Sequence, residues 1–393
     1  MKTLTLITLL VCCLVDGGDS LAHDQPLQVY ILVGQSNMQG HAHVRTLPHL
    51  AMDEDTKPLY DQIVDSNGVP KRIEDVWISS LSSQGVKTGQ LTTGFGADEN
   101  KIGPELTFGI TMKERVKQPI LIIKTAWGGK SLHTDFRSPS AGPYEFHPAV
   151  IARLEQQGKD LDAIRSQKEE ATGVFYRQTI DHINKVLSDI ESVYGDYNPQ
   201  VGYELAGLVW FQGWNDLVDT NAYPQRYQAD GYDDYRRTLI HWIRDVRKDL
   251  SAPNLPIVIG VMGVGGPTQS YSPQKQRYRE IHQNFRDAMA APAQESEFQG
   301  SVVAVLTENA WDSELASIID RDEQLQRELN ASNQQDQLEQ KRKVTFNARE
   351  LQILKVGKSN AAFHYLGSSK ILGRIGKAFA EQLPSVEDSD KGL

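Results

Sequence analysis

The chain of 393 residues has little cysteine, and all of it lies near the N-terminus. Its two cysteines, Cys12 and Cys13, fall inside a segment, residues 1–22, that has the features of a secretory signal. Lys2 gives a positive start, an apolar run of about a dozen residues is too short to span a bilayer, and residues 20–22 form a small-x-small cleavage site. We therefore expect an exported protein, secreted or periplasmic, whose mature chain has no disulfide, thiolate catalyst or cysteine metal site.

The chain also lacks an excess of positive charge and, beyond residue 22, any long apolar run. The formal net charge is −10 and the pI is near 5.5, which argues against a nucleic-acid binder with a basic face. The missing apolar run argues against a membrane-spanning segment. We expect one large domain over residues 23–384, with insertions at 45–104 and 312–355, and a disordered tail at 385–393.

Five short apolar runs are typical of buried parallel strands, because each is continuous rather than alternating. They are residues 27–33, 119–123, 206–211, 256–262 and 301–306. Helical patterns lie between and beside them, at residues 105–116, 149–160, 173–194, 233–249 and 274–291. This alternation predicts a doubly wound α/β fold with about five parallel strands and ligands bound at their carboxyl ends.

Three further segments need separate interpretations. Residues 45–104 are mostly loop-like, and loops of that length are usually functional or carry a small structure of their own. Residues 312–352 are charged and rich in strong helix formers, which predicts a solvated helical arm. The last segment, from His364 to Leu383, has an amphipathic pattern that predicts a helix packed on the sheet, with His364 at its leading edge.

The first predicted strand ends in an unusual way, in the sequence VYILVGQSNMQG of residues 29–40. A single serine, Ser36, follows a glycine and is surrounded by amides. Gly, Ser and Asn are ordinary turn residues, so this stretch alone also fits a plain turn. A serine at the carboxyl end of a parallel strand, however, has its hydroxyl in the crevice where α/β folds bind ligands.

Three other polar stretches follow predicted strands or open the last helix, and together with Ser36 they have the chemistry of ester hydrolysis. Ser36 can supply the attacking hydroxyl and His364 the base. The oxyanion donors would be the backbone N–H groups of Ser36 and Gly129 and the side-chain amide of Asn215. We expect Gln35, Trp127 and Gln212 to contact the substrate, with Trp127 as a wall for a sugar ring.

These motifs resemble those of the SGNH hydrolases and, more narrowly, of the sialate O-acetylesterase and acetyl-xylan esterase group, carbohydrate esterase family six. They are GQSN (34–37), KTAWGGKSL (124–132) followed by DFRSPSAG (135–142), FQGWND (211–216) and HYLGS (364–368), with GPELTFG (103–109) as a further similar segment. The resemblance runs from about residue 27 to residue 383. It implies a flavodoxin-like three-layer α/β/α sandwich, and it makes Ser36 the nucleophile, His364 the base, and Gly129 and Asn215 parts of the oxyanion hole.

Two departures from the family pattern concern the group that orients the histidine. The family usually has an aspartate three residues before it, where this chain has Ala361, and many relatives have glutamate where this chain has Trp214. An acid from elsewhere would fill the role, with Asp216, Glu308 and Asp312 as candidates. The other interpretation, which we prefer, is a Ser–His dyad whose imidazole is oriented by a group that is not a carboxylate, such as a backbone carbonyl.

The resemblance implies neither a metal nor an organic cofactor. The implied partner is an acetylated oligosaccharide or polysaccharide, and the sequence leaves xylan, sialic acid and sulfated glycans open.

Two alternative functions remain. The missing acid also fits a carbohydrate-binding protein that has lost turnover. A lipid or longer-chain ester hydrolase on the same scaffold would need an apolar acyl groove, which a site rich in Gln, Asn and Gly does not favour.

Overall fold

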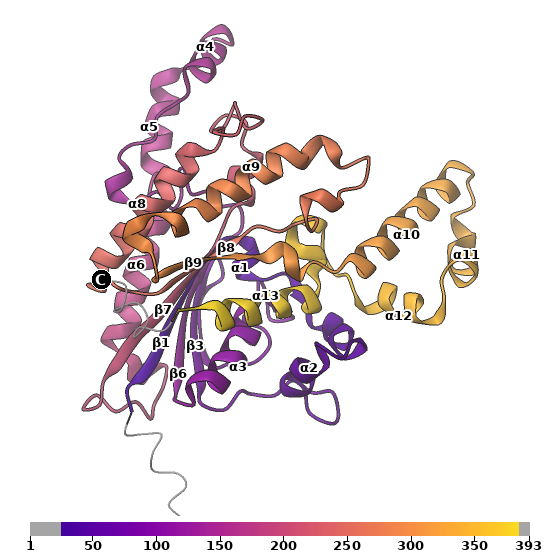
Figure 1. Cartoon of the computed structure of the whole chain (residues 1–393), viewed down its shortest axis with the longest axis horizontal. Coiled ribbons are helices and arrows are strands. Elements are labelled where there is room, and N and C mark those ends of the chain that lie inside the picture. Colours follow the sequence, from indigo (N-terminus) through magenta and orange to yellow (C-terminus); the bar gives the residue numbers. More distant parts are fainter. Residues whose placement is uncertain (1–24, 385–393) are drawn as a thin grey trace, which may run out of the picture.

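The computed structural model of the chain describes residues 25–384 (Figure 1). The predicted signal segment, residues 1–22, and the predicted tail, residues 385–393, lie outside the described residues. Within the described part, no helix combines the length and the apolar character needed to cross a membrane.

A seven-stranded sheet forms the centre of the molecule, in the order β4-β3-β6-β1-β7-β8-β9. Neighbouring strands are parallel except β3 and β4, which are antiparallel. All five strands predicted from apolar runs are present in it. The strands are β1 (Leu27–Gly34), β3 (Val76–Ser82), β4 (Gly85–Gln90), β6 (Ile120–Ala126), β7 (Tyr203–Phe211), β8 (Ile257–Val261) and β9 (Val302–Leu306).

The hairpin of β3 and β4 differs from the expectation, because it lies within residues 45–104, where we expected mainly loop. The sheet therefore has six parallel strands rather than about five. β3 was not predicted because two of its buried residues are serines, which interrupt the apolar run. The Ser79 hydroxyl is hydrogen-bonded to His182 Nε2 at 3.2 Å. β4 was hidden because it is an edge strand whose residues are mostly exposed, so it has no apolar run.

The five predicted strands, numbered in chain order, have the spatial order 2-1-3-4-5. This is the flavodoxin-like order, and its topological switch point lies between the first and third of these strands, β1 and β7. Ligands bind in open α/β sheets at the carboxyl ends of the strands beside such a point. The topology therefore predicts a ligand site formed by the loops that follow β1, β6 and β7.

Helices cover both faces of the sheet, which confirms the three-layer α/β/α architecture (Figure 1). On one face Phe379 of α13 packs edge-on against Phe211, with 5.2 Å between ring centroids, and on the other Trp242 of α8 packs on Trp210 at 4.3 Å. The first face carries α3 (Glu105–Val116) and α13 (Ser369–Gln382). The second carries α6 (Val174–Ser188), α8 (Asp233–Asp249) and α9 (Arg279–Ala290).

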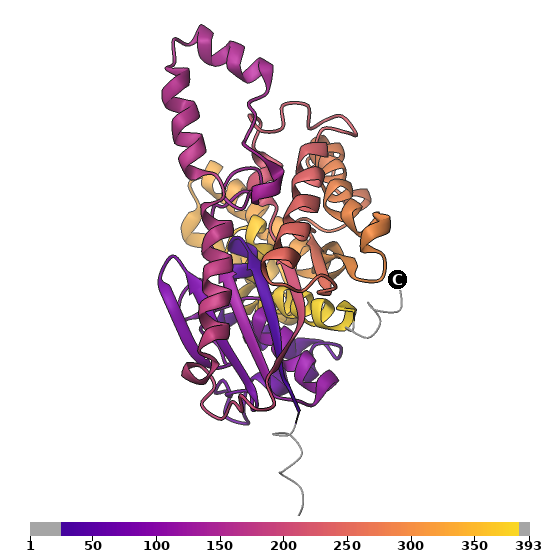
Figure 2. The ribbon, with the colours of Figure 1, turned by 90° about the vertical axis from the view of Figure 1, so that its left-hand side faces the viewer.

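The predicted helices are all present, and α3 and α8 have the predicted bounds. Three others are shorter than predicted: α4 covers Pro148–Gln156, α6 ends at Ser188 and α9 begins at Arg279. The helices α2 (Lys57–Ile63) and α5 (Leu161–Ala171) were not predicted. α2 lies within residues 45–104, where we expected mainly loop, and none of the residues of α5 is buried. Together α4 and α5 project beyond the sheet (Figure 2).

The charged segment after β9 folds into a helical arm, as predicted, and extends away from the sheet (Figure 1). Its helices are α10 (Ser313–Ala331), α11 (Leu338–Thr345) and α12 (Ala348–Val356). Arg342 of α11 makes two hydrogen bonds of 2.7 Å to the Asp322 carboxylate of α10, which holds the arm together. The chain then leads from α12 directly into the turn that carries His364.

Candidate active site

The register of three adjacent strands places the starts of their polar loops side by side at the same edge of the sheet. Gly34, the last residue of β1, is paired with Ala126 of β6 on one side and with Phe211 of β7 on the other. A Cβ atom on Gly34 would lie 2.1 Å from the Phe211 carbonyl oxygen, so only glycine fits this close approach. The residues that follow each strand therefore begin side by side at the switch point.

Ser36 is the first residue of the short helix α1 (Ser36–Gln39), and 6% of its surface is exposed. It lines a cavity of about 720 Å³, and the predicted residues Gly129, Asn215, His364 and Trp127 line the same cavity. Five of the predicted side chains or backbone positions thus converge, although they are separated by up to several hundred residues of sequence.

Gln35 lies behind this cavity and sets the orientation of Asn215. Its Oε1 accepts a hydrogen bond of 3.0 Å from the Gly213 backbone N–H, and because that group can only donate, the oxygen of Gln35 must face it. The Gln35 NH₂ group then donates to Asn215 Oδ1 at 3.0 Å. The Asn215 NH₂ group is consequently the part of its side chain left for the cavity.

Gln35 and Gln212 do not line the cavity, in contrast to our expectation that they contact substrate. Both are almost fully buried, at 1% and 2% exposure. Gln212 donates to the Lys130 carbonyl at 3.0 Å and to Asp216 Oδ2 at 2.5 Å, so its hydrogen bonds go to protein groups. The two amides therefore connect the loops that carry Ser36, Gly129 and Asn215.

Gly129 has a left-handed backbone conformation, with φ of 75°, in the loop after β6. A Cβ atom there would meet nothing within 4 Å, so the conformation, and not crowding, requires glycine. The preceding glycine, Gly128, borders Ser36, since a Cβ atom added to it would lie 3.9 Å from Ser36 Cβ. The loop after β6 thus borders the serine at Gly128.

Asp216 is fully buried and ties the loop after β6 to the end of β7. Its carboxylate accepts hydrogen bonds from the backbone N–H groups of Leu132 and His133, at 2.8 and 3.1 Å, and from the Tyr223 hydroxyl at 2.9 Å. With the bond from Gln212, these fill its acceptor sites. Its role is to hold the loop, and none of these bonds reaches His364.

Glu308 and Asp312, the other acids considered for orienting His364, are also engaged elsewhere. Glu308 is paired with Arg286. Asp312 caps α10 by accepting from the Leu315 backbone N–H at 2.9 Å and pairs with Lys370 at 2.7 Å. The hydrogen bonds of all three candidate acids are therefore made without His364.

The group that is hydrogen-bonded to the His364 ring is the side chain of Asn360, four residues earlier. Asn360 Oδ1 lies 3.0 Å from His364 Nδ1 and also accepts from the Ala361 backbone N–H at 2.8 Å. The hydrogen-bond partner of the ring is thus a side-chain amide, neither one of the three acids nor the backbone carbonyl considered from the sequence. The sequence signal for it was an Asn one position before the place where the family has its acid.

His364 lies in a tight turn before α13, and the two residues after it are in the left-handed region. Tyr365 has φ of 51° and Leu366 φ of 61°, which is costly for residues with large side chains. The buried Tyr365 hydroxyl accepts from the Gly263 backbone N–H at 2.8 Å and lies 2.6 Å from Thr307 Oγ1. These contacts fix the turn, and with it the position of the imidazole.

The imidazole of His41 lies flat against that of His364. The ring centroids are 4.0 Å apart and the interplanar angle is 2°. Burial, together with the positive charge of Lys101, lowers the pKa of His364 to about 4, and burial likewise lowers the pKa of His41 to about 3. His364 is therefore neutral over most of the pH range, with a lone pair available on the nitrogen that does not face Asn360.

Aromatic side chains form the walls of the cavity. On one side Trp127 packs against Phe175 with 4.9 Å between ring centroids, and the Lys130 ammonium lies 4.2 Å from the centre of the Phe175 ring. On the other side Trp214, which replaces the glutamate of many relatives, packs on Phe363 at 5.6 Å. Such walls offer apolar faces with polar edges, as sugar rings require.

A buried ion pair supports α1 from behind. Lys124 and Glu105 are almost fully buried and their charged atoms are 2.7 Å apart. Lys124 Nζ also donates to the Gln39 carbonyl, at the end of α1, and to the Phe95 carbonyl, at 3.0 and 2.8 Å. The pair therefore fixes the helix that begins with Ser36. Among residues 25–384, no group of three or more His, Cys, Asp or Glu side chains could hold a metal ion.

Comparison with protein families gives one match, and it covers most of the chain. The family model described as carbohydrate esterase, sialic acid-specific acetylesterase matches residues 26–303. This range contains Ser36, Gly129 and Asn215, whereas His364 lies beyond it. No curated protein sequence matches the chain.

Solved structures similar to this chain have low sequence identity to it. A protein from Arabidopsis thaliana is 18% identical, with a TM-score of 0.39 over 72% of this chain and 86% of that one. A carbohydrate acetylesterase from Xanthomonas citri is 14% identical, with a TM-score of 0.36 over 68% and 48%. NanS is 15% identical, with a TM-score of 0.35 over 72% and 78%.

Proposed function

We propose that this chain, which belongs to the carbohydrate esterase family of sialic acid-specific acetylesterases, removes O-acetyl groups from a carbohydrate through an acyl-enzyme at Ser36. We further propose that it works outside the cytoplasm, because residues 1–22 have the features of a secretory signal. The observation that carries the proposal is the convergence of Ser36, His364 and two kinds of oxyanion donor on one cavity.

In the proposed reaction the Ser36 hydroxyl oxygen attacks the acetyl carbonyl carbon while His364 takes the hydroxyl proton. The carbonyl oxygen becomes an oxyanion, held by the N–H groups of Ser36 and Gly129 and by the Asn215 NH₂ group. When the tetrahedral intermediate collapses, the C–O bond to the sugar breaks and His364 gives its proton to the sugar oxygen. Water, deprotonated by His364, then attacks the acetyl-enzyme and releases acetate.

The position of the Ser36 hydroxyl bears on the first step. No hydrogen bond joins it to the His364 ring among the described residues, and Ser36 Oγ instead lies 3.5 Å from Gln35 Nε2. Catalytic hydrogen bonds are often long in sites without substrate and tighten in the Michaelis complex. The mechanism therefore requires a rotation of the serine side chain toward the imidazole when an acetyl group binds.

The decisive experiment is acetate release by the Ser36→Ala variant. We expect turnover of 4-nitrophenyl acetate and of acetylated sugars to fall to background, because in the proposed reaction the Ser36 hydroxyl is the nucleophile. Ser166→Ala is the matched control, since Ser166 lies on the exposed face of α5. Wild-type turnover in the Ser36→Ala variant would refute the proposal.

The substrate is proposed to be an acetylated sugar rather than a lipid, because the cavity combines Trp127 and Trp214 with amides and Lys130. Acetate release from acetylated sialic acid, acetyl-xylan and sulfated acetyl-glycans, compared with an acyl-length series of 4-nitrophenyl esters, separates these classes. A preference for acyl chains longer than acetate would contradict the carbohydrate assignment.

A second candidate function is a carbohydrate-binding protein without turnover. The neutral partner of His364 and the missing hydrogen bond between Ser36 and His364 favour it. A serine-directed fluorophosphonate probe distinguishes the two, because only an activated hydroxyl reacts. Binding of an acetylated glycan without labelling of Ser36 would support this second function.

A further inference from the structure

The site contains a neutral amide where an orienting acid is usual, and the geometry of that amide determines the protonation of the histidine. The Ala361 backbone N–H, 2.8 Å from Asn360 Oδ1, can only donate, so the atom of Asn360 that faces it must be the oxygen. The same oxygen is 3.0 Å from His364 Nδ1. Nδ1 must therefore carry the hydrogen, and Nε2 is the nitrogen with the free lone pair.

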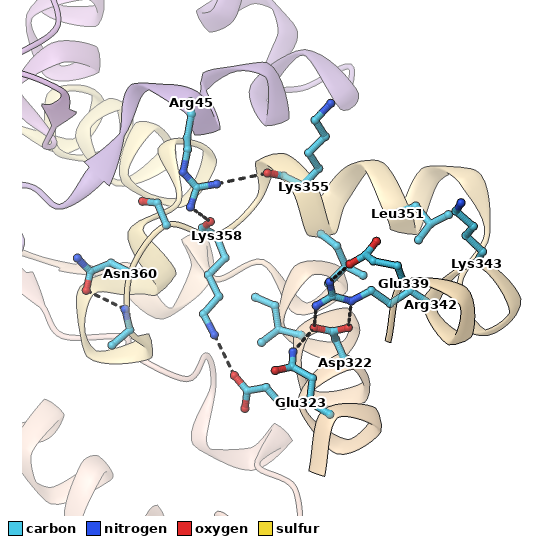
Figure 3. A pocket seen from close by; sticks show the side chains of 15 residues that line it. Arg45, Asp322, Glu323, Glu339, Arg342, Lys343, Leu351, Lys355, Lys358 and Asn360 are labelled. Atoms are coloured by element: carbon cyan, nitrogen blue, oxygen red, sulfur yellow. Dashed lines mark hydrogen bonds and ion pairs between the residues drawn. The ribbon is translucent and has the colours of Figure 1, made fainter. Parts of the chain in front are cut away.

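The backbone on both sides of the contact between Asn360 and His364 is held by hydrogen bonds. The N–H groups of Ser359 and Asn360 both donate to the Leu366 carbonyl, at 2.9 and 3.0 Å, and the His364 N–H donates to the Ala361 carbonyl at 3.0 Å. Just upstream, Arg45 donates to the Lys358 carbonyl at 2.9 Å. Figure 3 shows Asn360 at one side of a second cavity, of about 820 Å³, and Lys358 between Asn360 and Glu323 of the arm.

We propose that Asn360 is the positioning residue for His364, which selects the Nδ1–H tautomer without supplying a negative charge. This inference rests on the proposed function, because it assigns a partner to the proposed base. An acid in the same place would do two things, select the tautomer and stabilise the imidazolium. Asn360 does only the first, so the two effects are separated in this protein.

The consequence is a base that keeps working at low pH. The groups that bear on the ring are His41 from the segment after α1, Phe363 in the same turn, and Lys101 of β5 (Lys101–Ile102), whose ammonium is paired with Asp98. None of them places a carboxylate against the imidazole. The burial that lowers the pKa of His364 to about 4 is therefore not opposed, and the unprotonated base persists into acidic solution.

The test compares the pH dependence of kcat/KM for the full-length wild type, Asn360→Asp and Asn360→Leu, measured as acetate release. In the wild type we expect kcat/KM to fall on the acid side of its pH profile with a midpoint near pH 4, and we call this fall the acid limb. Asn360→Asp keeps an oxygen for the Ala361 N–H and adds a negative charge beside Nδ1, so the limb should move up by about one to three pH units. Asn360→Leu keeps the size and removes the acceptor, so kcat should fall by about 10²-fold with little change in KM.

An acid limb of Asn360→Asp that coincides with that of the wild type would overturn the proposal. If Asn360→Leu does not fold, Asn360→Asp decides the question alone. A readout that needs no turnover is the nitrogen NMR spectrum of His364, assigned with a His364→Gln variant. The Nδ1–H tautomer is expected, and an Nε2–H tautomer would refute the role of Asn360 even if Ser36→Ala confirms the esterase. An Nδ1–H tautomer together with wild-type turnover in Ser36→Ala would instead support the role of Asn360 and refute the proposed esterase reaction.

Discussion

The imidazole rings of His41 and His364 are stacked almost perfectly parallel, with centroids 4.0 Å apart and 2° between their planes. Asn360 contacts the edge of the His364 ring, and His41 covers one of its faces. The first contact fixes rotation within the ring plane, and the second fixes the plane itself. Two side chains from distant parts of the sequence thus determine where the proposed base can direct its lone pair.

The stacked pair predicts different effects for two substitutions of His41. His41→Ala removes the cover, so water reaches the imidazole, and the acid limb of kcat/KM should rise from about pH 4 toward the ordinary histidine value of 6.5. His41→Phe keeps a flat ring in place, so its limb should stay near that of the wild type. Acetate release between about pH 3.5 and 8 measures both, because this range spans the wild-type limb near 4 and the ordinary histidine value near 6.5. Equal limbs in His41→Ala and the wild type would show that the stack does not control the pKa of His364.

The buried amide of Gln35 predicts a large effect from a nearly isosteric change. Gln35→Glu keeps an oxygen for the Gly213 N–H but loses the NH₂ group that donates to Asn215 Oδ1. Asn215 is then free to turn its oxygen toward the cavity, where it would repel the oxyanion. We expect kcat to fall by about 10²- to 10³-fold, the range found when one oxyanion donor is lost.

The matched comparison for Gln35→Glu is Asn215→Ala, which removes the donor directly. The two variants should lose similar amounts of kcat, and the double variant should lose little more, because both act on the same donor. Additive losses would mean that Gln35 supports the site in some other way. Thermal unfolding of each variant shows whether the fold itself is kept.

The sequence predicted the five central strands, their α/β class and the residues that converge on the cavity, because those depend on local patterns. Buried parallel strands are continuous apolar runs, and their carboxyl ends must share one edge of the sheet. Ser36, Gly129 and Asn215 each follow such a run directly. Their placement therefore needed only the order of strands in the sheet, which the family resemblance supplied.

What the sequence did not predict depends on contacts between distant segments. β3 has buried serines whose partner, His182, is about a hundred residues away, and no local pattern reveals it. Gln35 and Gln212 look like substrate ligands in sequence, but burial and hydrogen bonds to other loops remove them from the cavity wall. Asn360 was not predicted because the family has its acid at the next position, where this chain has Ala361. The geometry of the turn instead brings the Asn360 side chain to the ring.

Buried and half-buried histidines with lowered pKa values predict that the protein loses stability in acid. Folded, they stay neutral down to low pH, whereas in the unfolded chain they bind a proton near pH 6.5. Between these values the unfolded state binds more protons, so the free energy of unfolding should decrease as the pH falls from about 6.5 toward 4. The four with the lowest pKa values are His41 at about 3 and His49, His282 and His364 at about 4.

Urea unfolding at pH 7, 6, 5 and 4.5 measures this effect. His282→Gln is a useful variant, because it removes one titrating group on α9 that is not among the residues lining the cavity. In the wild type the Nδ1 atom of His282 lies 2.7 Å from the Tyr271 hydroxyl. Its stability should change less between pH 6.5 and 4.5 than that of the wild type. A stability that is constant over this range in the wild type would contradict the lowered pKa values.

The buried pair of Lys124 and Glu105 predicts a large loss of stability when one partner alone is removed. Lys124→Met leaves the Glu105 carboxylate buried without its counter-charge, and breaking such a pair costs about 3–5 kcal/mol. The loss of the bond to the Gln39 carbonyl should also loosen α1, so kcat should fall in the variant at temperatures where it is still folded. Urea unfolding and acetate release measure the two effects separately.

Two variants make this prediction specific to burial. In Lys124→Met/Glu105→Gln the remaining amide is neutral and can still accept from the Gly103 N–H, so part of the stability should return. Lys377→Met breaks a pair of the same chemistry on the exposed surface of α13, between residues 377 and 381, and should cost no more than about 1 kcal/mol. If both single substitutions cost the same, burial would not be what makes the Lys124 pair important, and the support of α1 would have to come from packing alone.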